Sequence, residues 1–308
     1  MSQHLTIGSR GSALALTQSQ AVRDLLLGAH PNLQVDIEVI RTTGDATSGS
    51  LRDLGGAGLF TKEIETSLLN RRVDLAVHSL KDLPTEQHPD LELTAVPARE
   101  DVRDVLIAGR SLPELRTIDD LPEKALIGTG SRRRQAQLLA LRPDLRFVEI
   151  RGNLDTRIGR ASAGECDAVV LAAAGMHRLG WRDRIGAYIA PEQLLPAPGQ
   201  AALGLQMRRD DPLRSLLGAV DDPTAHAAVR AERSLLRTLG GGCQAPIAAW
   251  GRLREGELLL DGLVGNEAGT RILRLQEIGS LERAEELGEQ LGQRLLTGGA
   301  PSLLDEVS

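Results

Sequence analysis

The stretch 74–84, DLAVHSLKDLP, decides how the rest of the chain is interpreted. Residues 74–77 have the composition of a short apolar strand, and Pro84 prevents a helix from continuing through that point. We therefore expect residues 78–82 to form a loop at the carboxyl end of a strand, where ligands gather in open α/β sheets. This loop carries a hydroxyl, an ammonium group and a carboxylate, on Ser79, Lys81 and Asp82. The alternative is a surface turn whose charged side chains are only solvated.

Length and composition are those of an ordinary globular protein. The chain has 308 residues, enough for two or three domains, and is 41% hydrophobic and 25% charged. No apolar run approaches the roughly 20 residues that cross a bilayer, so we expect no membrane span. The first residues, MSQHLTIGSRGS, have no charged-then-apolar leader, which predicts a cytoplasmic protein.

The charge balance argues against a general nucleic-acid binder. The net charge is −6, and aromatic residues, at 2%, leave almost nothing to stack on bases. The positive charge is nearly all arginine, since Lys62, Lys81 and Lys124 are the only lysines. A GC-rich genome gives such a bias without functional meaning, but it does not explain why several arginines lie at strand-to-helix turns.

Two of these turns share one pattern. Residues 6–10 are predicted to form a strand that runs into a turn, and Ser12 then caps a helix over 13–29. Residues 125–132 again form an apolar strand ending in hydroxyl residues and an arginine, before a helix over 133–141. Backbone N–H groups at a helix start favour anions, and hydroxyl and guanidinium groups strengthen that preference for carboxylates or phosphates.

Arginines accumulate at and after the second turn. Plain helix capping explains the serines but not the run 132–134, whose like charges repel one another unless an anion or water compensates them. Arg151, Arg157 and Arg178 follow further along the chain. Each alone is an ordinary ion-pair residue, but together they would suit a multiply carboxylated ligand.

The remaining periodicities predict two lobes of similar build. Strands are expected at 34–41, 91–97, 147–150 and 167–171, and helices at 60–72 and 154–163. The strand at 167–171 repeats the pattern of 74–77, and residues 99–103 form a polar crossing. The expected fold class is α/β, with two periplasmic-binding-protein-like lobes around a cleft.

A small C-terminal α/β domain is predicted to follow the lobes. Residues 195–200, rich in proline, and the apolar 201–207 carry the chain back to the first lobe. Beyond 221–223, the pattern predicts a helix at 224–239, strands at 247–253, 257–264 and 271–278, and a helix at 281–296. The expected domains are therefore 1–99 with 196–219, then 100–195, and finally 220–308.

The two cysteines form neither a disulfide framework nor a metal site. Cys166 precedes an apolar strand, so we expect a small buried residue. Cys243 lies in GGGCQAP (240–246), where the glycines end the preceding helix and leave the thiol on a loop. Because no general base is close in the sequence, a covalent anchor is a better interpretation of Cys243 than a hydrolytic nucleophile.

Six motifs, in this order and spacing, resemble the porphobilinogen deaminase (hydroxymethylbilane synthase) family. They are VHSLKDLP (77–84), GTGSRRRQAQ (128–137), RGNLDTR (151–157), LAAAGMHRLG (171–180), LPAPGQAA (195–202) and GGGCQAPI (240–247). The resemblance covers nearly the whole chain. It implies a transferase of tetrapyrrole (heme and porphyrin) biosynthesis, which condenses four porphobilinogen units head to tail into hydroxymethylbilane and releases ammonia. It also implies a metal-free monomer that hands its product to a downstream cyclising synthase.

The resemblance assigns roles to individual residues. It implies that Cys243 carries a dipyrromethane cofactor through a thioether and that Asp82 is the catalytic carboxylate. The cofactor-binding residues that it implies are Lys81, Ser79, Thr129, Ser131, Arg133, Arg134 and Arg157. The substrate-binding residues that it implies are Arg10, Ser12, Arg151, Arg178, Phe60 and Gln200. Loss of ammonia from the substrate leaves an electron-poor azafulvene, and attack by the next pyrrole puts positive charge on ring nitrogens, which a fixed carboxylate stabilises.

The chain departs from the family at three positions. Ala57 stands where members often have a lysine, Asp53 where some are basic, and Ala201 where glycine is common. The first two remove positive charge from a loop, and the third predicts a minor packing change.

Two non-enzymatic alternatives stay open at the level of sequence. A two-lobed receptor for a polycarboxylate explains the arginines but has no need of Cys243. A nucleic-acid protein reading phosphates through 132–134 fits neither the net charge nor the scarce aromatic residues.

Overall fold

The computed structural model describes residues 3–42, 61–112, 114–242 and 245–305. The chain divides into two compact units, Met1–Glu100 with Ala202–His226 and Asp101–Ala201 with Ala227–Ser308. Among the described residues, the first unit contains one sheet and the second contains two.

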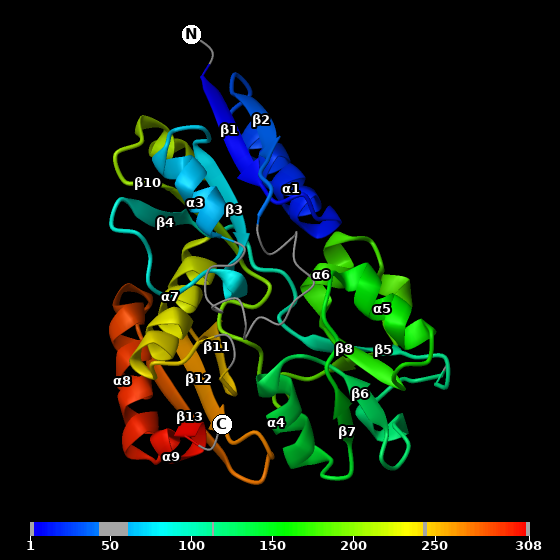
Figure 1. Ribbon diagram of the computed structural model, residues 1–308. Helices are drawn as coiled ribbons and strands as arrows, with labels where there is room; N and C mark the ends of the chain where they lie inside the picture. The colour runs from blue at the N-terminus through cyan, green and yellow to red at the C-terminus, as the bar shows by residue number, and fades with distance from the viewer. Residues whose placement is uncertain (1–2, 43–60, 113, 243–244, 306–308) are drawn as a thin grey trace. The chain divides into compact units, whose positions relative to one another are not determined.

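The sheet of the first unit lies between helices (Figure 1). Its strand order is β2 (Gln34–Val39), β1 (His4–Ser9), β3 (Leu75–Ser79), β10 (Leu203–Arg208) and β4 (Leu91–Ala95). β1 pairs in parallel with β2 and β3, whereas β10 is antiparallel to β3 and β4. Helix α1 (Ala13–Ala29) packs Val22 and Leu26 against Leu75, and α3 (Lys62–Leu69) packs Ile64 against Ala76. Because neighbouring residues of a strand point to opposite faces, the two helices cover opposite sides of the sheet.

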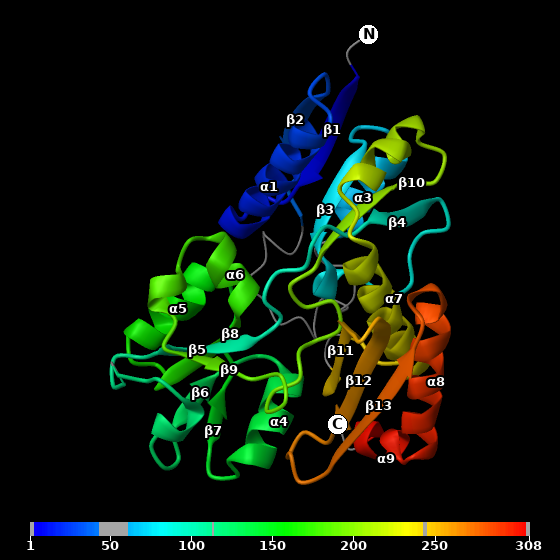
Figure 2. The same cartoon turned by 180° about the vertical axis from the view of Figure 1, so that it is seen from behind.

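A second sheet repeats this order in the other unit. Its strands are β7 (Arg146–Val148), β6 (Leu126–Gly128), β8 (Ala168–Ala172), β5 (Asp104–Ala108) and β9 (Ala187–Ile189), the last at the edge beside β5 (Figure 2). β6 is parallel to β7 and β8, and β5 is antiparallel to β8 and β9. β5 therefore holds the place that β10 holds in the first sheet. Helix α4 (Arg132–Leu141) contributes to one hydrophobic cluster, and α5 (Leu154–Ser162) and α6 (Ala173–Arg178) contribute to another.

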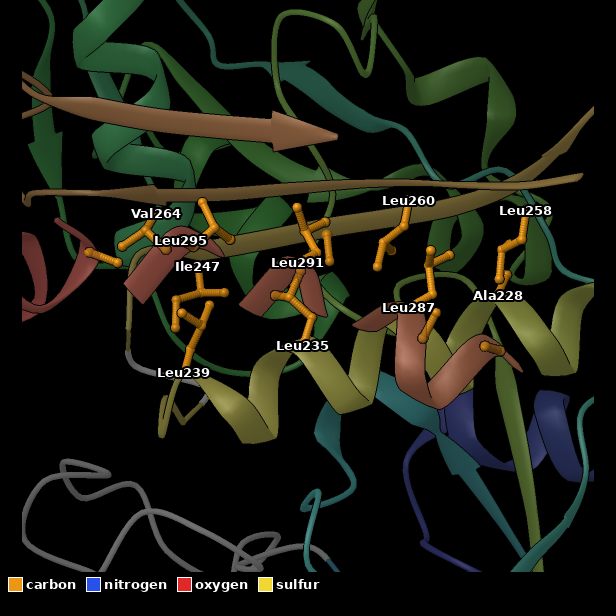
Figure 3. Packing of buried hydrophobic residues seen from close by; sticks show 14 of the residues in the cluster. Ala228, Leu235, Leu239, Ile247, Leu258, Leu260, Val264, Leu287, Leu291 and Leu295 are labelled. Atoms are coloured by element: carbon orange, nitrogen blue, oxygen red, sulfur yellow. The ribbon is translucent and has the colours of Figure 1, made fainter. Parts of the chain in front are cut away.

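The C-terminal part is a three-stranded meander covered by helices. Its strands are β11 (Ile247–Arg254), β12 (Glu257–Gly265) and β13 (Ile272–Gly279), and its helices are α7 (Pro223–Thr238), α8 (Ala284–Thr297) and α9 (Ala300–Asp305). Figure 3 shows Leu235 of α7 and Leu291 of α8 packed beneath Leu260 of β12. Each leucine so buried stabilises the fold by about 2 kcal/mol. Short 3-10 turns complete the described chain at Leu80–Asp82 (η1), Ile118–Asp120 (η2), Arg182–Arg184 (η3), Pro212–Ala219 (η4) and Leu281–Arg283 (η5).

These elements confirm the predicted α/β class, with two lobes of like topology and a small third group of strands and helices. The helix predicted over 13–29 has those bounds. The loop predicted over 78–82 is partly wrong, because β3 continues through Ser79 and only η1 leaves it. Two strands of the second sheet were not predicted, β5, which directly follows the polar crossing, and β9. In the part of the chain that is described, no helix is long and apolar enough to span a membrane.

Candidate functional site

The turn after β3 is anchored by two buried leucines. Leu80 and Leu83 are 1% and 3% exposed. The Leu80 N–H donates to the carbonyl oxygen of Ala202 at 3.0 Å, and the Leu83 N–H donates to the carbonyl oxygen of Leu80 at 3.2 Å. Between the two leucines, Lys81 is half-buried and Asp82 is exposed. The turn therefore presents a carboxylate on a backbone that its neighbours hold in place.

The last residues of β3 are oriented by polar side chains around them. Gln18 Nε2 donates to Ser79 Oγ at 2.9 Å, and the Ser79 hydroxyl donates back to Gln18 Oε1 at 3.2 Å. His78 Nε2 lies 3.0 Å from Gln206 Oε1, and Gln206 Nε2 donates to Glu65 Oε1 at 3.0 Å. The strand end is thus fixed from α1 on one side and from β10 and α3 on the other.

The turn after β1 carries Arg10 and Ser12. Ser12 Oγ accepts a hydrogen bond from the Ala15 N–H at 3.3 Å, so the predicted helix cap is confirmed. Arg10 is half-buried in the same turn. This part of the first unit therefore offers an arginine beside a capped helix start, a combination that favours anions.

The corresponding turn after β6 is shaped by its own hydroxyls. Thr129 Oγ1 accepts from the Ser131 N–H at 3.2 Å, and Ser131 Oγ accepts from the Arg134 N–H at 3.4 Å. A methyl group placed on Gly130 would lie 3.6 Å from the carbonyl oxygen of Ile150, so this turn lies close to the segment after β7. The polar groups of the turn are therefore ordered by the fold itself.

Arg133 and Arg134 share one buried carboxylate, that of Asp104. The two arginine side chains are 4% and 7% exposed, and Asp104 is fully buried. Arg133 Nη2 lies 2.8 Å from Asp104 Oδ2, and its Nη1 donates to the carbonyl oxygen of Leu195 at 2.7 Å. Arg134 donates from Nη2 and Nε to Asp104 Oδ1 at 2.7 and 3.1 Å, and from Nη1 to the carbonyl oxygen of Val170 at 2.9 Å. Two guanidinium groups against one carboxylate leave this cluster with one net positive charge.

Gln200 completes the cluster around Asp104. Its Nε2 donates to Asp104 Oδ1 at 3.1 Å and to the carbonyl oxygen of Val102 at 2.7 Å, and the residue is fully buried. Burial alone would raise the pKa of Asp104, but the charges of Arg133 and Arg134 outweigh it and lower that pKa to about 2. Asp104 is therefore a carboxylate at neutral pH.

The third arginine of the run has a separate partner. Arg132 Nη1 lies 2.6 Å from Glu267 Oε1, in the turn between β12 and β13. Glu267 and Asp104 thus supply, from the protein itself, anions that compensate the run 132–134. The expectation that the run depends on water or an incoming anion for compensation is wrong for Arg132. Binding of an external anion by Arg133 and Arg134 stays a prediction.

Two further predicted arginines lie in the segment that follows β7. Arg151 Nε donates to Glu149 Oε1 at 2.7 Å, and Arg157 Nε donates to the carbonyl oxygen of Gly152 at 2.7 Å. Both side chains are half-buried. Within this segment, Arg151 is therefore held by a carboxylate and Arg157 by the backbone.

Arg178, at the end of α6, contacts a strained residue. Its Nη2 donates to the carbonyl oxygen of Ala201 at 2.7 Å. Ala201 has a φ of +71°, in the left-handed region that favours glycine. The alanine at this position therefore costs backbone strain, and the expectation that it changes only packing is wrong.

The predicted site residues lie in both compact units, and some lie outside the described residues. Arg151, Arg157 and Arg178 belong to the same unit as Asp104. Around Asp104 the structure brings together Arg133, Arg134 and Gln200, at the turn that Thr129 and Ser131 shape. The other compact unit holds Asp82, Lys81, Ser79, Arg10 and Ser12. Phe60 and Cys243, together with Asp53 and Ala57, lie outside the described residues.

Cys166 is a buried thiol, as the sequence predicts. It is 3% exposed, and burial raises its pKa. A thiol that is buried and protonated is a poor nucleophile. Cys166 therefore belongs to the core rather than to a reactive site.

Asp104 and Gln18 are two of the polar residues near the site that the sequence did not predict. Asp104 could have been found as a lone acid before the apolar run VLIA (105–108), where a strand starts on a charge. Gln18 could have been found as a polar position on the inner face of α1, where it is 3% exposed. Buried polar side chains are almost always hydrogen-bonded, so both positions carried a signal for a partner.

Comparison with protein-family models gives two matches. The model described as porphobilinogen deaminase, dipyromethane cofactor binding domain, matches residues 5–214. The model of the porphobilinogen deaminase C-terminal domain matches residues 226–297. The two matches together leave only short segments of the chain uncovered.

Curated relatives match over nearly their whole length. The chain is 46% identical over 305 residues to the porphobilinogen deaminase of Syntrophobacter fumaroxidans, covering 98% of this chain and 97% of that protein. It is 47% identical to the porphobilinogen deaminase of Syntrophus aciditrophicus, covering 98% of each chain. Among solved structures, the periplasmic VFT2 domain of Bordetella pertussis BvgS is similar at 15% identity with a TM-score of 0.43, over 71% of this chain and 86% of that one.

Proposed function

The chain belongs to the porphobilinogen deaminase family, and from that premise we propose which of its residues carry out the reaction. The enzyme is a transferase of tetrapyrrole biosynthesis, a hydroxymethylbilane synthase. It condenses four porphobilinogen units head to tail into hydroxymethylbilane and releases ammonia at each step. The family model that matches residues 5–214 is that of a dipyrromethane cofactor binding domain, so dipyrromethane is the cofactor.

The residues of the basic turn fit a cofactor that carries carboxylate arms. Arg133 and Arg134 face one carboxylate between them, which leaves one positive charge uncompensated within the cluster. Arg133 Nε is buried and, within the described residues, has no hydrogen-bond partner. A buried donor without a partner costs about 1–3 kcal/mol, which a ligand oxygen would offset. We propose that these two arginines hold the cofactor together with Thr129, Ser131, Arg157, Lys81 and Ser79, and that Cys243 is its anchor through a thioether.

Asp82 is the proposed catalytic carboxylate. When bound, the cofactor supplies the pyrrole end to which new units are joined. The exposed carboxylate of Asp82, on a turn that Leu80 and Leu83 anchor, can accept hydrogen bonds from pyrrole N–H groups and stabilise positive charge as it develops there. The anchored turn carries this proposal, because electrostatic stabilisation is strongest when the stabilising group does not need to reorganise.

Binding of substrate is proposed for six residues, most of which can donate hydrogen bonds to carboxylates. They are Arg10, Ser12, Arg151, Arg178, Phe60 and Gln200. Arginine forks bind carboxylates with two parallel hydrogen bonds, so they would orient acid groups that do not react. Gln200 directs its amide to Asp104 and Val102, and its proposed contribution is therefore indirect.

The remaining proposals concern the domains, the oligomeric state, the location and the partners of the protein. We propose three domains, 1–99 with 196–219, 100–195 and 220–308, the last carrying the anchor loop with Cys243. We further propose that the protein is a cytoplasmic monomer that takes up porphobilinogen, binds neither nucleic acid nor membrane, and passes its product to a cyclising synthase. Size-exclusion chromatography with light scattering tests the monomer.

Intact-protein mass spectrometry tests the proposed function. Purified protein should be heavier than its sequence by two linked pyrroles, and the excess should vanish in Cys243→Ser. Under limiting porphobilinogen the wild type should accumulate discrete heavier species, one for each unit added. An unmodified wild-type chain from a host with a normal porphobilinogen supply, which also takes up no substrate, would show that the assignment of Cys243 is wrong.

A further inference from the structure

Asp104 is a carboxylate that no ligand can reach. It is the first residue of β5, is fully buried, and its backbone pairs with Ala172 of β8 and Ile189 of β9. A group in this position cannot touch substrate or cofactor. Its only means of influencing the reaction is through the side chains that it contacts.

The contacts of Asp104 fix both arginines of the basic turn. Arg134 donates hydrogen bonds from Nε and Nη2 to Asp104 and from Nη1 to the carbonyl oxygen of Val170. Acceptors on β5 and β8 therefore set the plane of its guanidinium group. Arg133 is held between Asp104 and the carbonyl oxygen of Leu195, which leaves Nε as the nitrogen without a described partner. Gln200 in turn holds the carboxylate through Oδ1.

We propose that Asp104 is a positioning residue for the anion-binding turn: it fixes the orientation of Arg133 and Arg134 and reduces their charge to one net positive. The inference rests on the proposed role of these arginines in holding the cofactor. Without the carboxylate, two adjacent buried guanidinium groups would repel each other and swing toward solvent. With it, the turn is ordered before a ligand arrives, which reduces the conformational entropy lost on binding.

A second carboxylate in the same unit provides a matched control. Asp261 of β12 is also fully buried and is also contacted by two arginines and one glutamine. Arg252 Nη1 and Arg274 Nη2 lie 2.5 and 3.0 Å from its oxygens, and Gln276 Nε2 donates to Oδ1 at 2.7 Å. None of these residues belongs to the proposed site. Replacing Asp261 therefore reproduces the loss of a buried carboxylate that two arginines contact, without touching the basic turn.

The experiment compares Asp104→Asn with Asp261→Asn. Both variants should lower the melting temperature, because each leaves two arginines without their anion, buried ones at Asp104 and half-buried ones at Asp261. Only Asp104→Asn should slow cofactor loading, by roughly tenfold, when apoprotein is incubated with porphobilinogen and followed by intact mass. In the fraction that does load, Asp104→Asn should raise KM more than it lowers kcat. Equal loading rates and equal KM in the two variants would overturn the proposal.

A milder variant covers the case in which Asp104→Asn fails to fold. Gln200→Met removes one hydrogen bond from Asp104 and keeps the size of the side chain, so it should slow loading in the same direction by a smaller factor. The matched variant is Gln276→Met, which should load at the wild-type rate. Loading by Gln200→Met at the rate of Gln276→Met would also contradict the proposal.

Arginine variants separate failure of this inference from failure of the proposed function. If Arg133→Gln and Arg134→Gln load normally, the proposed cofactor-binding role of the turn is wrong. If both load slowly while Asp104→Asn loads like Asp261→Asn, the arginines bind the cofactor but Asp104 does not position them.

Discussion

The two five-stranded sheets share one topology, but their corresponding central strands, β3 and β8, end differently. In the first, β3 is flanked by parallel β1 and antiparallel β10, and in the second, β8 is flanked by parallel β6 and antiparallel β5. β3 ends in Ser79 and runs into a turn that carries Lys81 and Asp82, whereas β8 ends in Ala172 and runs directly into the helix that starts at Ala173.

The two sheets carry a carboxylate on different segments, Asp82 after β3 and Asp104 at the start of β5. Opposite Ser79 on β10 lies the apolar Leu203, and opposite Ala172 on β5 lies Asp104. Asp82 is exposed on its turn, whereas Asp104 is buried against two arginines. The exposed carboxylate thus lies on the turn after β3, whereas the buried one lies on the antiparallel strand that pairs with β8. Burial and partners decide which of the two can do chemistry, and topology does not.

The largest expected effect is on the exposed carboxylate. Asp82→Asn keeps the shape of the side chain and removes its charge, so it should slow condensation by about 10²-fold or more, because stabilisation of developing positive charge is lost. Asp82→Glu moves the oxygens by about one bond length, and misplacement by ~1 Å also costs about 10²-fold. Rates of product formation at saturating porphobilinogen measure both effects.

Asp90→Asn is the control for the Asp82 variants. Asp90 is another exposed aspartate of the first unit, after η1 and before β4. Its replacement should leave the rate within about twofold, as for most surface substitutions. If Asp82→Asn turned over substrate at the rate of Asp90→Asn, the proposed catalytic role of the exposed carboxylate would be wrong. The contrast with the buried carboxylate of Asp104 would then say nothing about chemistry.

The buried carboxylate should act on stability at low pH. The pKa of Asp104 is lowered to about 2 from an ordinary 3.8, so folding is favoured while the group is ionised, by about 2 kcal/mol. This contribution is complete above pH 3.8 and is lost as the pH falls through 2. The difference in unfolding free energy between the wild type and Asp104→Asn should therefore shrink from pH 5 to pH 2. Urea unfolding at fixed pH values measures it, and a constant difference would show that Asp104 is not held as a carboxylate.

Sequence patterns predicted the strands of both sheets except β5 and β9. The apolar runs at 74–77, 125–128 and 167–171 become β3, β6 and β8, because central strands of a covered sheet are buried on both faces and consist mostly of apolar residues. β5, with the sequence DVLIA, was not predicted although the runs at 74–77 and 167–171 also begin on aspartate. The burial of Asp104 depends on Arg133 and Arg134, about 30 residues away, which no local pattern contains.

The candidate site was predictable in its residue types but not in its pairings. The turn with Ser131 and the arginine run is visible in the sequence, as is the turn with Asp82. The sequence did not show that the three arginines of the run have different partners. Arg132 pairs with Glu267 on a distant turn, whereas Arg133 and Arg134 pair inward. Adjacent residues of a helix start point in different directions, so neighbours in sequence meet different partners.

The smallest expected effect tests the feature that the two lobes share. Ser12 and Ser131 cap the first helix of their sheets with bonds of 3.3 and 3.4 Å, so Ser12→Ala and Ser131→Ala should each cost about 1 kcal/mol of stability. Thermal denaturation should give similar losses for the two. The two variants should differ in cofactor loading, because only Ser131 lies at the turn of Arg133 and Arg134. Intact mass should show a lower fraction of loaded chain for Ser131→Ala and an unchanged fraction for Ser12→Ala. Equal loading in the two variants would mean that the Ser131 hydroxyl caps its helix and does not contribute to cofactor loading.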